Sequence, residues 1–370
     1  MYVQLLVIFL SLIAAWYYSQ GLTLWNQDHR RKQYVIFVCI LLILQSGLRH
    51  VAVGPDTYAY MLSFKNAGGT GWSDIWQNFY NVYILNTGRD AGYPLLEKLI
   101  YTICPEYRVY LFVIAIFFFW TLGRFIYFNT IKISDVLISL CLYQVLFYSF
   151  FSITGIRQTI ATAFTLLGYE YIQKRRILPF FILILIASFV HKSVLIFLPF
   201  YFLARFPKSK LLLIGSIVAL PIIFPLARQF ATLLANLSAS EAYMAYVQSE
   251  YETSGAQIFF VFMLLMALSS TIKYKYILTY KYIDTRPIIC AFALALIFTP
   301  LTWVDPSLMR VVQYYSIFSL LLLPVIINVY SKNQYFILIM CILLLCIVLI
   351  RRNADYAFFW EEMNLGANYL

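Results

Sequence analysis

The chain has 370 residues, of which 62% are hydrophobic and only 12% are charged, and its mean hydropathy is +0.79. These values exclude an ordinary soluble domain and are typical of a polytopic membrane protein. The net charge of +11 would fit a nucleic-acid partner, but the positive-inside rule explains it better, because the basic residues gather in one set of connectors. We therefore expect an all-α protein that binds the lipid bilayer and no nucleic acid.

Apolar segments of the kind that form membrane helices recur along the whole chain. The first is expected to be a retained helix and not a signal peptide, since no basic region precedes it and no cleavage site follows it. In chain order the segments are 1–19, 34–48, 108–128, 135–152, 156–172, 177–190, 193–204, 211–227, 256–272, 287–303, 308–330 and 335–350. A shorter apolar stretch, from Tyr93 to Cys104, is expected to be re-entrant or interfacial. The sequence thus predicts about 11–13 transmembrane or re-entrant helices in one integrated membrane domain, residues 1–370.

Basic connectors set the expected orientation of these helices. Groups of Lys and Arg follow the first segment and flank segment 177–204 on both sides, which places these connectors in the cytoplasm. A hairpin of two short helices is therefore favoured for 177–204 over one long helix, and its outer turn holds His191 and Lys192. Two long outer segments, about 49–92 and 228–255, are rich in aromatic residues. These residues fit an interfacial belt or a surface that stacks on sugar rings.

Three outer sites begin helices that run inward, and each site carries a cation. The sites are Gly155-Ile156-Arg157-Gln158, His191-Lys192-Ser193, and Asp305 to Arg310 with Gln313 one turn later. Helix N-termini present free N–H groups and the positive end of the helix dipole, so a neighbouring Arg or Lys completes a site for phosphate. For Arg157 and Arg310 we favour this function over snorkelling to lipid headgroups. Several cationic helix ends predict a large anion, and a lipid diphosphate fits.

The connector after segment 34–48 combines a cation, a turn and a carboxylate. Arg49 lies a few residues before Gly54-Pro55-Asp56. Asp56 could cap the next helix, or it could accept a proton or order Arg49. His191 could act as an acid, a base or a phosphate donor, or it could be structural. The local sequence leaves these alternatives open.

Several common kinds of active site have no motif in this chain. Walker A, dinucleotide-binding, His-Glu-x-x-His and Gly-x-Ser-x-Gly patterns are absent from the sequence, so ATP, NAD and a serine-hydrolase site are unsupported. The cysteines form no Cys-x-x-Cys pair, and His29 is expected on the opposite side of the membrane from His50 and His191, which argues against zinc. We expect no cofactor and no metal.

Four segments of the chain resemble the EpsG family, a group of Wzy-like bacterial polysaccharide polymerases. They are Ser46-Gly47-Leu48-Arg49 with Val53-Gly54-Pro55-Asp56-Thr57-Tyr58, Gly155-Ile156-Arg157-Gln158, His191-Lys192-Ser193 with Pro199, and Met309-Arg310 with Tyr314-Tyr315 and Pro324. Their order and spacing are similar to the family's across most of the chain. Pro55 is a departure, because the family often has Thr or another small polar residue before the Asp.

The resemblance implies a GT-C-type glycosyltransferase in the bacterial cytoplasmic membrane, with its active site facing the periplasm or the cell exterior. It would polymerise O-antigen, capsule or exopolysaccharide. The donor would be a growing glycan on undecaprenyl diphosphate, and the acceptor would be one lipid-linked repeat unit. A chain-length regulator is a further partner to consider.

The resemblance also implies roles for particular residues. Arg157 and Arg310 would neutralise the departing diphosphate, and Arg49 would hold the second phosphate or the donor sugar. Asp56 or His191 would deprotonate the acceptor hydroxyl, with Asp56 slightly preferred. Further contacts to the diphosphate or glycan are expected from Gln158, Lys192 and Tyr314.

Three other functions are weighed against this one. An O-antigen ligase would transfer the glycan to a different lipid, and polymer length would separate it from a polymerase. A lipid-glycan flippase or transporter should carry charges along a path through the membrane, whereas here they cluster at the outer rim. A membrane acyltransferase would need a cytoplasmic catalytic histidine, but His191 is expected outside.

Overall fold

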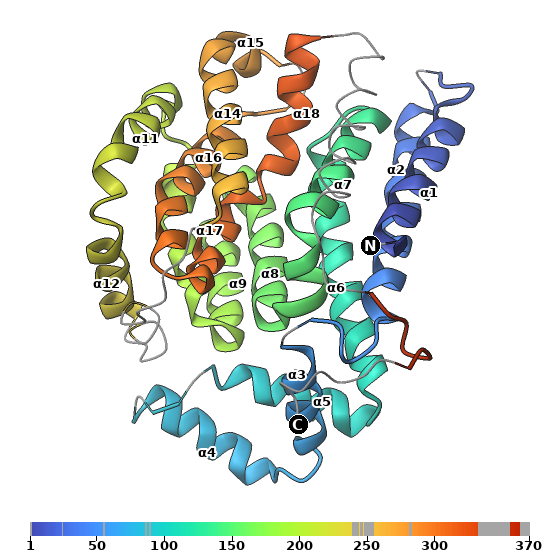
Figure 1. The fold of residues 1–370 in the computed structure, drawn as a ribbon, viewed down its shortest axis with the longest axis vertical. Helices are drawn as coiled ribbons and strands as arrows, with labels where there is room; N and C mark the ends of the chain where they lie inside the picture. The colour runs from blue at the N-terminus through green and yellow to red at the C-terminus, as the bar shows by residue number, and fades with distance from the viewer. Residues whose placement is uncertain are drawn as a thin grey trace. The chain divides into compact units, whose positions relative to one another are not determined.

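A computed structural model gives the fold of the chain (Figure 1). It describes residues 2–23, 25–54, 56–85, 87–88, 90–238, 244, 247, 255–280, 283–331 and 356–362. Within these ranges the regular elements are helices, together with one isolated β-bridge. Three of the helices are long and apolar enough to cross a membrane, or up to six if each of three bent helix pairs is one span. The expectation of an all-α polytopic membrane protein is confirmed.

The chain divides into two compact units. The first comprises residues 1–167, 185–191 and the described part of 337–370, and the second comprises 168–184 and the described part of 192–336. The expectation of one integrated membrane domain stays a prediction.

The first unit combines long apolar helices with three shorter helices that run crosswise (Figure 1). Its helices are α1 (Tyr2–Ser19), α2 (Gln27–Gly47), α3 (Thr57–Asn66), α4 (Trp72–Tyr83), α5 (Gly92–Ile103), α6 (Tyr107–Phe128), α7 (Ile133–Leu146) and the π-helix η1 (Tyr148–Thr154), with parts of α8 (Ile156–Gln173) and α9 (Ile177–Val190). Helix α2 packs along α6, and α1 packs against α2 and α7. Buried aromatic rings such as Phe118, Phe119 and Tyr143 fill the space between these helices.

The second unit is arranged around α16. Its elements are the 3-10 helix η2 (Lys192–Phe197), α10 (Phe200–Leu203), α11 (Ser209–Ile223), α12 (Ala227–Ser238), α14 (Gln257–Ile272), α15 (Tyr274–Leu278), α16 (Arg286–Phe298), η3 (Thr299–Trp303), η4 (Pro306–Leu308), α17 (Met309–Ser316) and α18 (Ser319–Tyr330). Helix α16 contacts α11, α14, α17 and α18. Its surface is apolar and largely buried, as expected of a helix enclosed by others.

The described helices follow most of the predicted apolar segments, with local differences. Segment 308–330 is two helices, α17 and α18, with a bend of 57° between them. Segment 135–152 is α7 followed by the π-helix η1, with a bend of 68° between them. Segment 193–204 is a 3-10 helix and a short α-helix separated by Pro199, because proline cannot donate the backbone hydrogen bond that a continuous helix needs. Segment 335–350 and half of the predicted outer segment 228–255 lie outside the described residues.

The predicted hairpin at 177–204 is confirmed. Helix α9 ends at Val190, and the chain then reverses. The ring of Phe180 lies 6.2 Å from that of Phe197 and 5.3 Å from that of Tyr201. With 14 residues, α9 is about 21 Å long, which is shorter than the hydrocarbon core of a bilayer.

Candidate functional site

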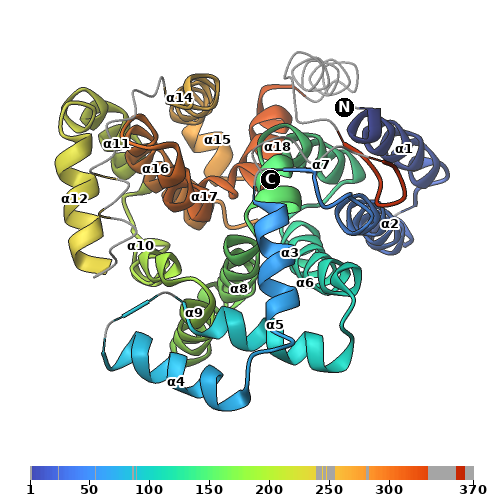
Figure 2. The ribbon, with the colours of Figure 1, turned by 60° about the horizontal axis from the view of Figure 1, so that its bottom comes forward.

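Four predicted site residues gather at one end of the first unit. Helix α2 ends at Gly47 and α9 at Val190, while α8 begins at Ile156, all close to the crosswise helices α3, α4 and α5 (Figures 1 and 2). Arg49 and His191 follow the ends of α2 and α9, and Arg157 is the second residue of α8. Asp56 directly precedes α3. The topology inferred from the basic connectors placed the same four residues on one side of the membrane.

Asp90 links two of these residues. Its Oδ2 atom lies 3.3 Å from Nδ1 of His191 and 3.7 Å from Nη1 of Arg157. Asp90 and His191 are each only 8% exposed, whereas the side chain of Arg157 is 32% exposed. A buried carboxylate is costly unless cations and hydrogen-bond donors surround it. The Arg157 guanidinium and the His191 ring meet that need, so the three groups form one polar cluster.

The two ring nitrogens of His191 have different surroundings. Nε2 is buried and has no hydrogen-bond partner among the described residues. A buried polar atom without a partner costs about 1–3 kcal/mol, and such atoms in native structures call for an explanation. When a carboxylate holds Nδ1–H, the opposite nitrogen is the one that can take a proton. The geometry therefore suits His191 to act as a general base.

Gly92 allows the segments that carry Asp90 and His191 to approach each other closely. A Cβ atom on Gly92 would lie 2.7 Å from Cβ of Phe189 and 2.8 Å from its carbonyl carbon. Helix α5 can therefore begin against the end of α9 only because residue 92 lacks a side chain. Asp90 and His191 lie two residues from these contact points, so the close approach sets their separation.

Arg157 is held in a defined orientation at the second position of α8. Its guanidinium carbon lies 4.9 Å from the centre of the Tyr93 ring, in cation–π geometry. Tyr93 is itself buried, and its hydroxyl lies 2.8 Å from that of Tyr110. The ring and Asp90 thus fix the guanidinium, while a third of the side chain stays accessible. This arrangement suits bidentate binding of phosphate oxygens.

A second carboxyl group, that of Glu97, lies further along α5. It is 1% exposed, and Oε2 accepts a hydrogen bond of 2.7 Å from the hydroxyl of Ser63. Burial raises the pKa of Glu97, and the hydrogen bonds from Ser63 and Tyr93 offset this only in part. Glu97 thus favours the protonated form more than an exposed glutamate does.

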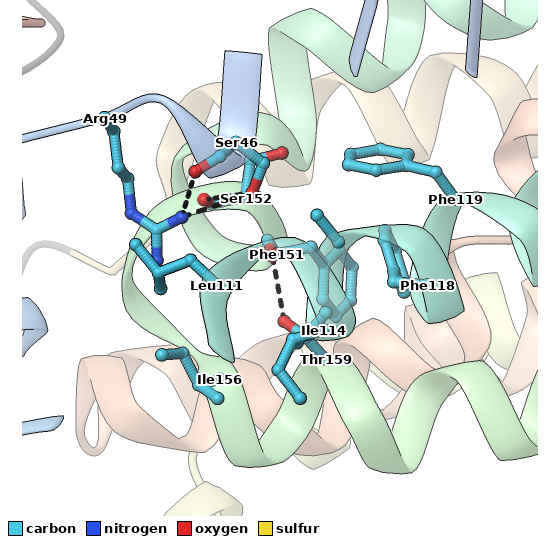
Figure 3. Close-up of a pocket in the computed structure, with 11 residues that line it drawn as sticks. Ser46, Arg49, Leu111, Ile114, Phe118, Phe119, Phe151, Ser152, Ile156 and Thr159 are labelled. Carbon is cyan, nitrogen blue, oxygen red and sulfur yellow. Dashed lines mark hydrogen bonds between the residues drawn. The ribbon is translucent and has the colours of Figure 1, made fainter. Parts of the chain in front are cut away.

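Arg49 points into the protein and binds backbone carbonyls (Figure 3). Its guanidinium donates to the carbonyl of Ser46 and, over 3.3 Å, to that of Ile153 in the π-helix η1. The hydroxyls of Ser46 and Thr159 donate to the carbonyls of Ser152 and Phe151. Three consecutive carbonyls at the end of η1 thus accept bonds from side chains, as helix ends require. Arg49 therefore braces the turn that leads into Arg157.

The same residues border a small apolar cavity. Its lining includes Leu111, Ile114 and Phe118 besides Arg49 and the η1 carbonyl region (Figure 3). It has room for roughly one water molecule. The cavity is therefore too small for a glycan or a diphosphate, and Arg49, which is 3% exposed, contributes to the fold around it.

A C-terminal segment pairs with the backbone around Arg49. Residues 49 and 358 form an antiparallel β-bridge. The amide of His50 donates to the carbonyl of Ala357 over 2.8 Å, and that of Phe359 donates to the carbonyl of Leu48 over 2.9 Å. These bonds fasten residues 356–362 to the end of α2.

The predicted site residues Asp56 and Gln158 differ in exposure. Asp56 precedes α3 and is exposed, but its side chain makes no cap hydrogen bond and no ion pair with Arg49 among the described residues. Gln158 is 2% exposed within α8. The structure therefore gives Asp56 an open position at the surface and gives Gln158 a place in the protein interior.

Three further predicted residues belong to the second unit. Lys192 begins the 3-10 helix η2, and Arg310 is the second residue of α17; both are half-buried. Asp305 caps the turn before α17, because its Oδ1 accepts a bond of 2.7 Å from the amide of Ser307. Tyr314 is fully buried, and its hydroxyl lies 2.9 Å from that of Ser193. In this structure Tyr314 ties α17 to η2.

Sequence reasoning missed Asp90, Gly92, Tyr93 and Glu97. Their one signal was position: a carboxylate and a glycine directly before the apolar stretch from Tyr93 to Cys104. Within the described ranges, no three His, Cys, Asp or Glu side chains come together as metal ligands do.

Comparison with known proteins gives one match. A family model, that of the EpsG family, matches residues 32–363. No curated protein and no solved structure matches the chain.

Proposed function

The chain belongs to the EpsG family, and on this premise we propose that it is a glycosyltransferase that polymerises a bacterial surface polysaccharide. Family membership suggests a polysaccharide polymerase-like function, and the apolar helices indicate a membrane protein. The proposed donor is a growing glycan on undecaprenyl diphosphate, and the acceptor is one lipid-linked repeat unit at the outer face of the cytoplasmic membrane. The observation that carries the proposal is the Asp90–His191 pair beside the accessible Arg157.

The reaction forms one bond and breaks one. A hydroxyl oxygen of the acceptor sugar bonds to the anomeric carbon of the donor sugar, and the bond from that carbon to the diphosphate oxygen breaks. The electron pair leaves with the diphosphate, and the hydroxyl proton goes to a base. Because the donor already carries a good leaving group, the reaction needs no ATP.

His191 is the proposed base. Asp90 holds Nδ1 at 3.3 Å, which leaves Nε2 to accept the proton and stabilises the imidazolium that forms. Asp56 was the slightly preferred base from sequence. Among the described residues the Asp56 side chain is exposed and has no ion-pair or capping partner that would orient it, so we prefer His191 as the base.

Arg157 is the proposed stabiliser of the leaving diphosphate. Its guanidinium is oriented by Asp90 and Tyr93 before the substrate arrives, so charge that develops on the phosphate oxygens meets a preorganised cation. Arg310 and Lys192 are proposed to bind phosphate as well, as half-buried cations at helix starts of the second unit. Arg49 is assigned a supporting role.

The test is gel analysis of lipid-linked glycan in cells that lack the gene and carry one variant each. Wild type should give a ladder of polymer lengths, whereas His191→Ala and Arg157→Ala should give single repeat units. Arg108→Ala is the matched control, because Arg108 is an exposed cation of the same unit that stacks on Phe359 at 4.4 Å. It should retain the ladder.

Three results would contradict the proposal or one of its parts. Long polymer in cells without the gene would mean that another enzyme polymerises the glycan. A normal ladder from His191→Ala would remove His191 as the base. Full-length polymer that fails to reach its final lipid acceptor in the null strain would instead indicate a ligase.

A further inference from the structure

Helix α4 exposes a row of large apolar side chains. Trp72, Trp76, Tyr80 and Ile84, here called the α4 stripe, recur every four residues and are 44%, 61%, 50% and 64% exposed. Residues four apart lie above one another on a helix, so these side chains form one continuous surface. A single exposed apolar residue needs no explanation, but a row of four does.

The rest of α4 shows that the stripe is one of three sectors around the helix. Ile75 and Val82 face the protein core and are 2% and 1% exposed. The polar sector contains Gln77 and Asn81, whose side chains are hydrogen-bonded to each other over 3.0 Å. At 100° per residue the α4 stripe lies between the core-facing and the polar sectors. A helix at a lipid–water boundary shows this order of apolar and polar surface.

The direction of α4 agrees with such a position. In Figure 1 the helix runs crosswise to α2 and α6, and Figure 2 shows it again lying across the end of the first unit. Helix α6 is a candidate membrane span of 22 residues. A helix that lies crosswise at the end of a spanning helix is at the level of the membrane surface.

From these observations we infer that α4 lies in the membrane interface, with the α4 stripe in contact with phospholipid. Trp and Tyr are the residues enriched at this level of a bilayer. The amino group of Lys98 lies 5.9 Å from the centre of the Trp72 ring, which places a cation where anionic headgroups would be. The last residue of the stripe, Ile84, is aliphatic, and so is its neighbour Leu85, which is 53% exposed. Aliphatic side chains suit acyl chains and offer no flat face to a sugar ring.

Contact of α4 with the membrane interface would also set the depth of the candidate site relative to the bilayer. The rings of Phe79 and Tyr83 on α4 lie 6.1 Å and 5.3 Å from the ring of Phe189 on α9. Asp90 lies in the connection from α4 to α5. An anchored α4 would therefore hold Asp90 at the level of the headgroups. The membrane contact itself does not depend on the proposed reaction.

The test replaces one residue at a time by the photoreactive amino acid p-benzoylphenylalanine in the full chain. The protein is reconstituted in vesicles of phosphatidylethanolamine and phosphatidylglycerol and irradiated, and adducts are identified by mass spectrometry. Positions 76 and 80 should form phospholipid adducts several-fold more often than position 77, which lies on the polar sector. Ile116, 52% exposed on α6, is the positive control for lipid contact.

The outcomes decide the inference independently of polymerase activity. Phospholipid adducts at Trp76 and Tyr80 but not at Gln77 support it. Crosslinked dimers from Trp76 would show that a second copy covers the stripe and would overturn it. Equal yields at Trp76 and Gln77, while Ile116 reacts with lipid, would show that lipid does not distinguish the stripe from the polar sector and would also overturn it. Because two stripe positions are used, misfolding of one variant does not decide the result.

Discussion

Substitution of Gly92 by alanine should separate Asp90 from His191. The added Cβ would lie 2.7 Å from Cβ of Phe189 and 2.8 Å from its carbonyl oxygen, whereas non-bonded carbon atoms rest about 3.5–4.0 Å apart. Backbone atoms cannot rotate away, so the start of α5 must move by roughly 1 Å. If Asp90 follows, its distance from Nδ1 of His191 grows from 3.3 Å beyond hydrogen-bonding range.

The expected consequences concern both stability and activity. Overpacking of this kind costs about 1–3 kcal/mol, so the thermal midpoint in detergent should fall. A displacement of about 1 Å in a catalytic group lowers turnover by roughly a hundredfold, so the glycan ladder should shrink to single units. Gly215→Ala is the matched control, because its Cβ meets nothing within 4 Å. A Gly92→Ala variant with the midpoint and ladder of wild type would refute the reasoning.

Three further substitutions test the supporting residues. Arg49→Lys should lower the free energy of unfolding by about 1–3 kcal/mol, measured by thermal or denaturant unfolding in detergent, because one ammonium cannot replace both guanidinium bonds; wild-type stability would contradict the bracing role. Tyr93→Leu should polymerise roughly fivefold more slowly than Tyr93→Phe, since only the latter keeps about 1 kcal/mol of cation–π contact with Arg157; equal rates would remove that contact from the mechanism. Since burial raises the pKa of Glu97 above its ordinary value, the stability it contributes is full below about pH 4 and is lost as pH rises through the raised pKa. Unfolding midpoints across this range should therefore fall less for Glu97→Gln than for wild type, and parallel curves would show that Glu97 does not titrate as proposed.

The helices were predictable because lipid imposes a simple rule on the sequence. Every backbone group must be satisfied inside the bilayer, so apolar runs become helices and basic connectors separate them. Helix α9 begins and ends where the apolar run 177–190 does. The π-helix η1 was not predictable, because it continues an apolar run whose composition does not change. Its bend depends on side chains from α2 and α8 that bond its carbonyls, and these contacts are distant in sequence.

The candidate site was predictable only in part, for the same physical reason. Arg157 and His191 were recognisable because a charge beside an apolar run is costly and needs a purpose. The position of Asp90 before an apolar stretch was a weaker signal, because Asp90 lies in an outer segment with several other acidic residues. Its importance arises from the contact between α5 and α9 at Gly92, which brings residue 90 next to a residue 101 positions later.

The site contains two carboxyl groups, Asp90 before α5 and Glu97 within it, and their surroundings differ. Asp90 meets the Arg157 guanidinium and the His191 ring. Glu97 is surrounded by hydroxyls and aromatic rings, and burial favours its neutral form. If Glu97 ionised, it would compete with a phosphate for Arg157, so a neutral Glu97 leaves that cation available to the substrate. Carboxyl groups held in different surroundings are typical of sites that move protons, which supports the proposal that the Asp90 cluster takes part in the reaction.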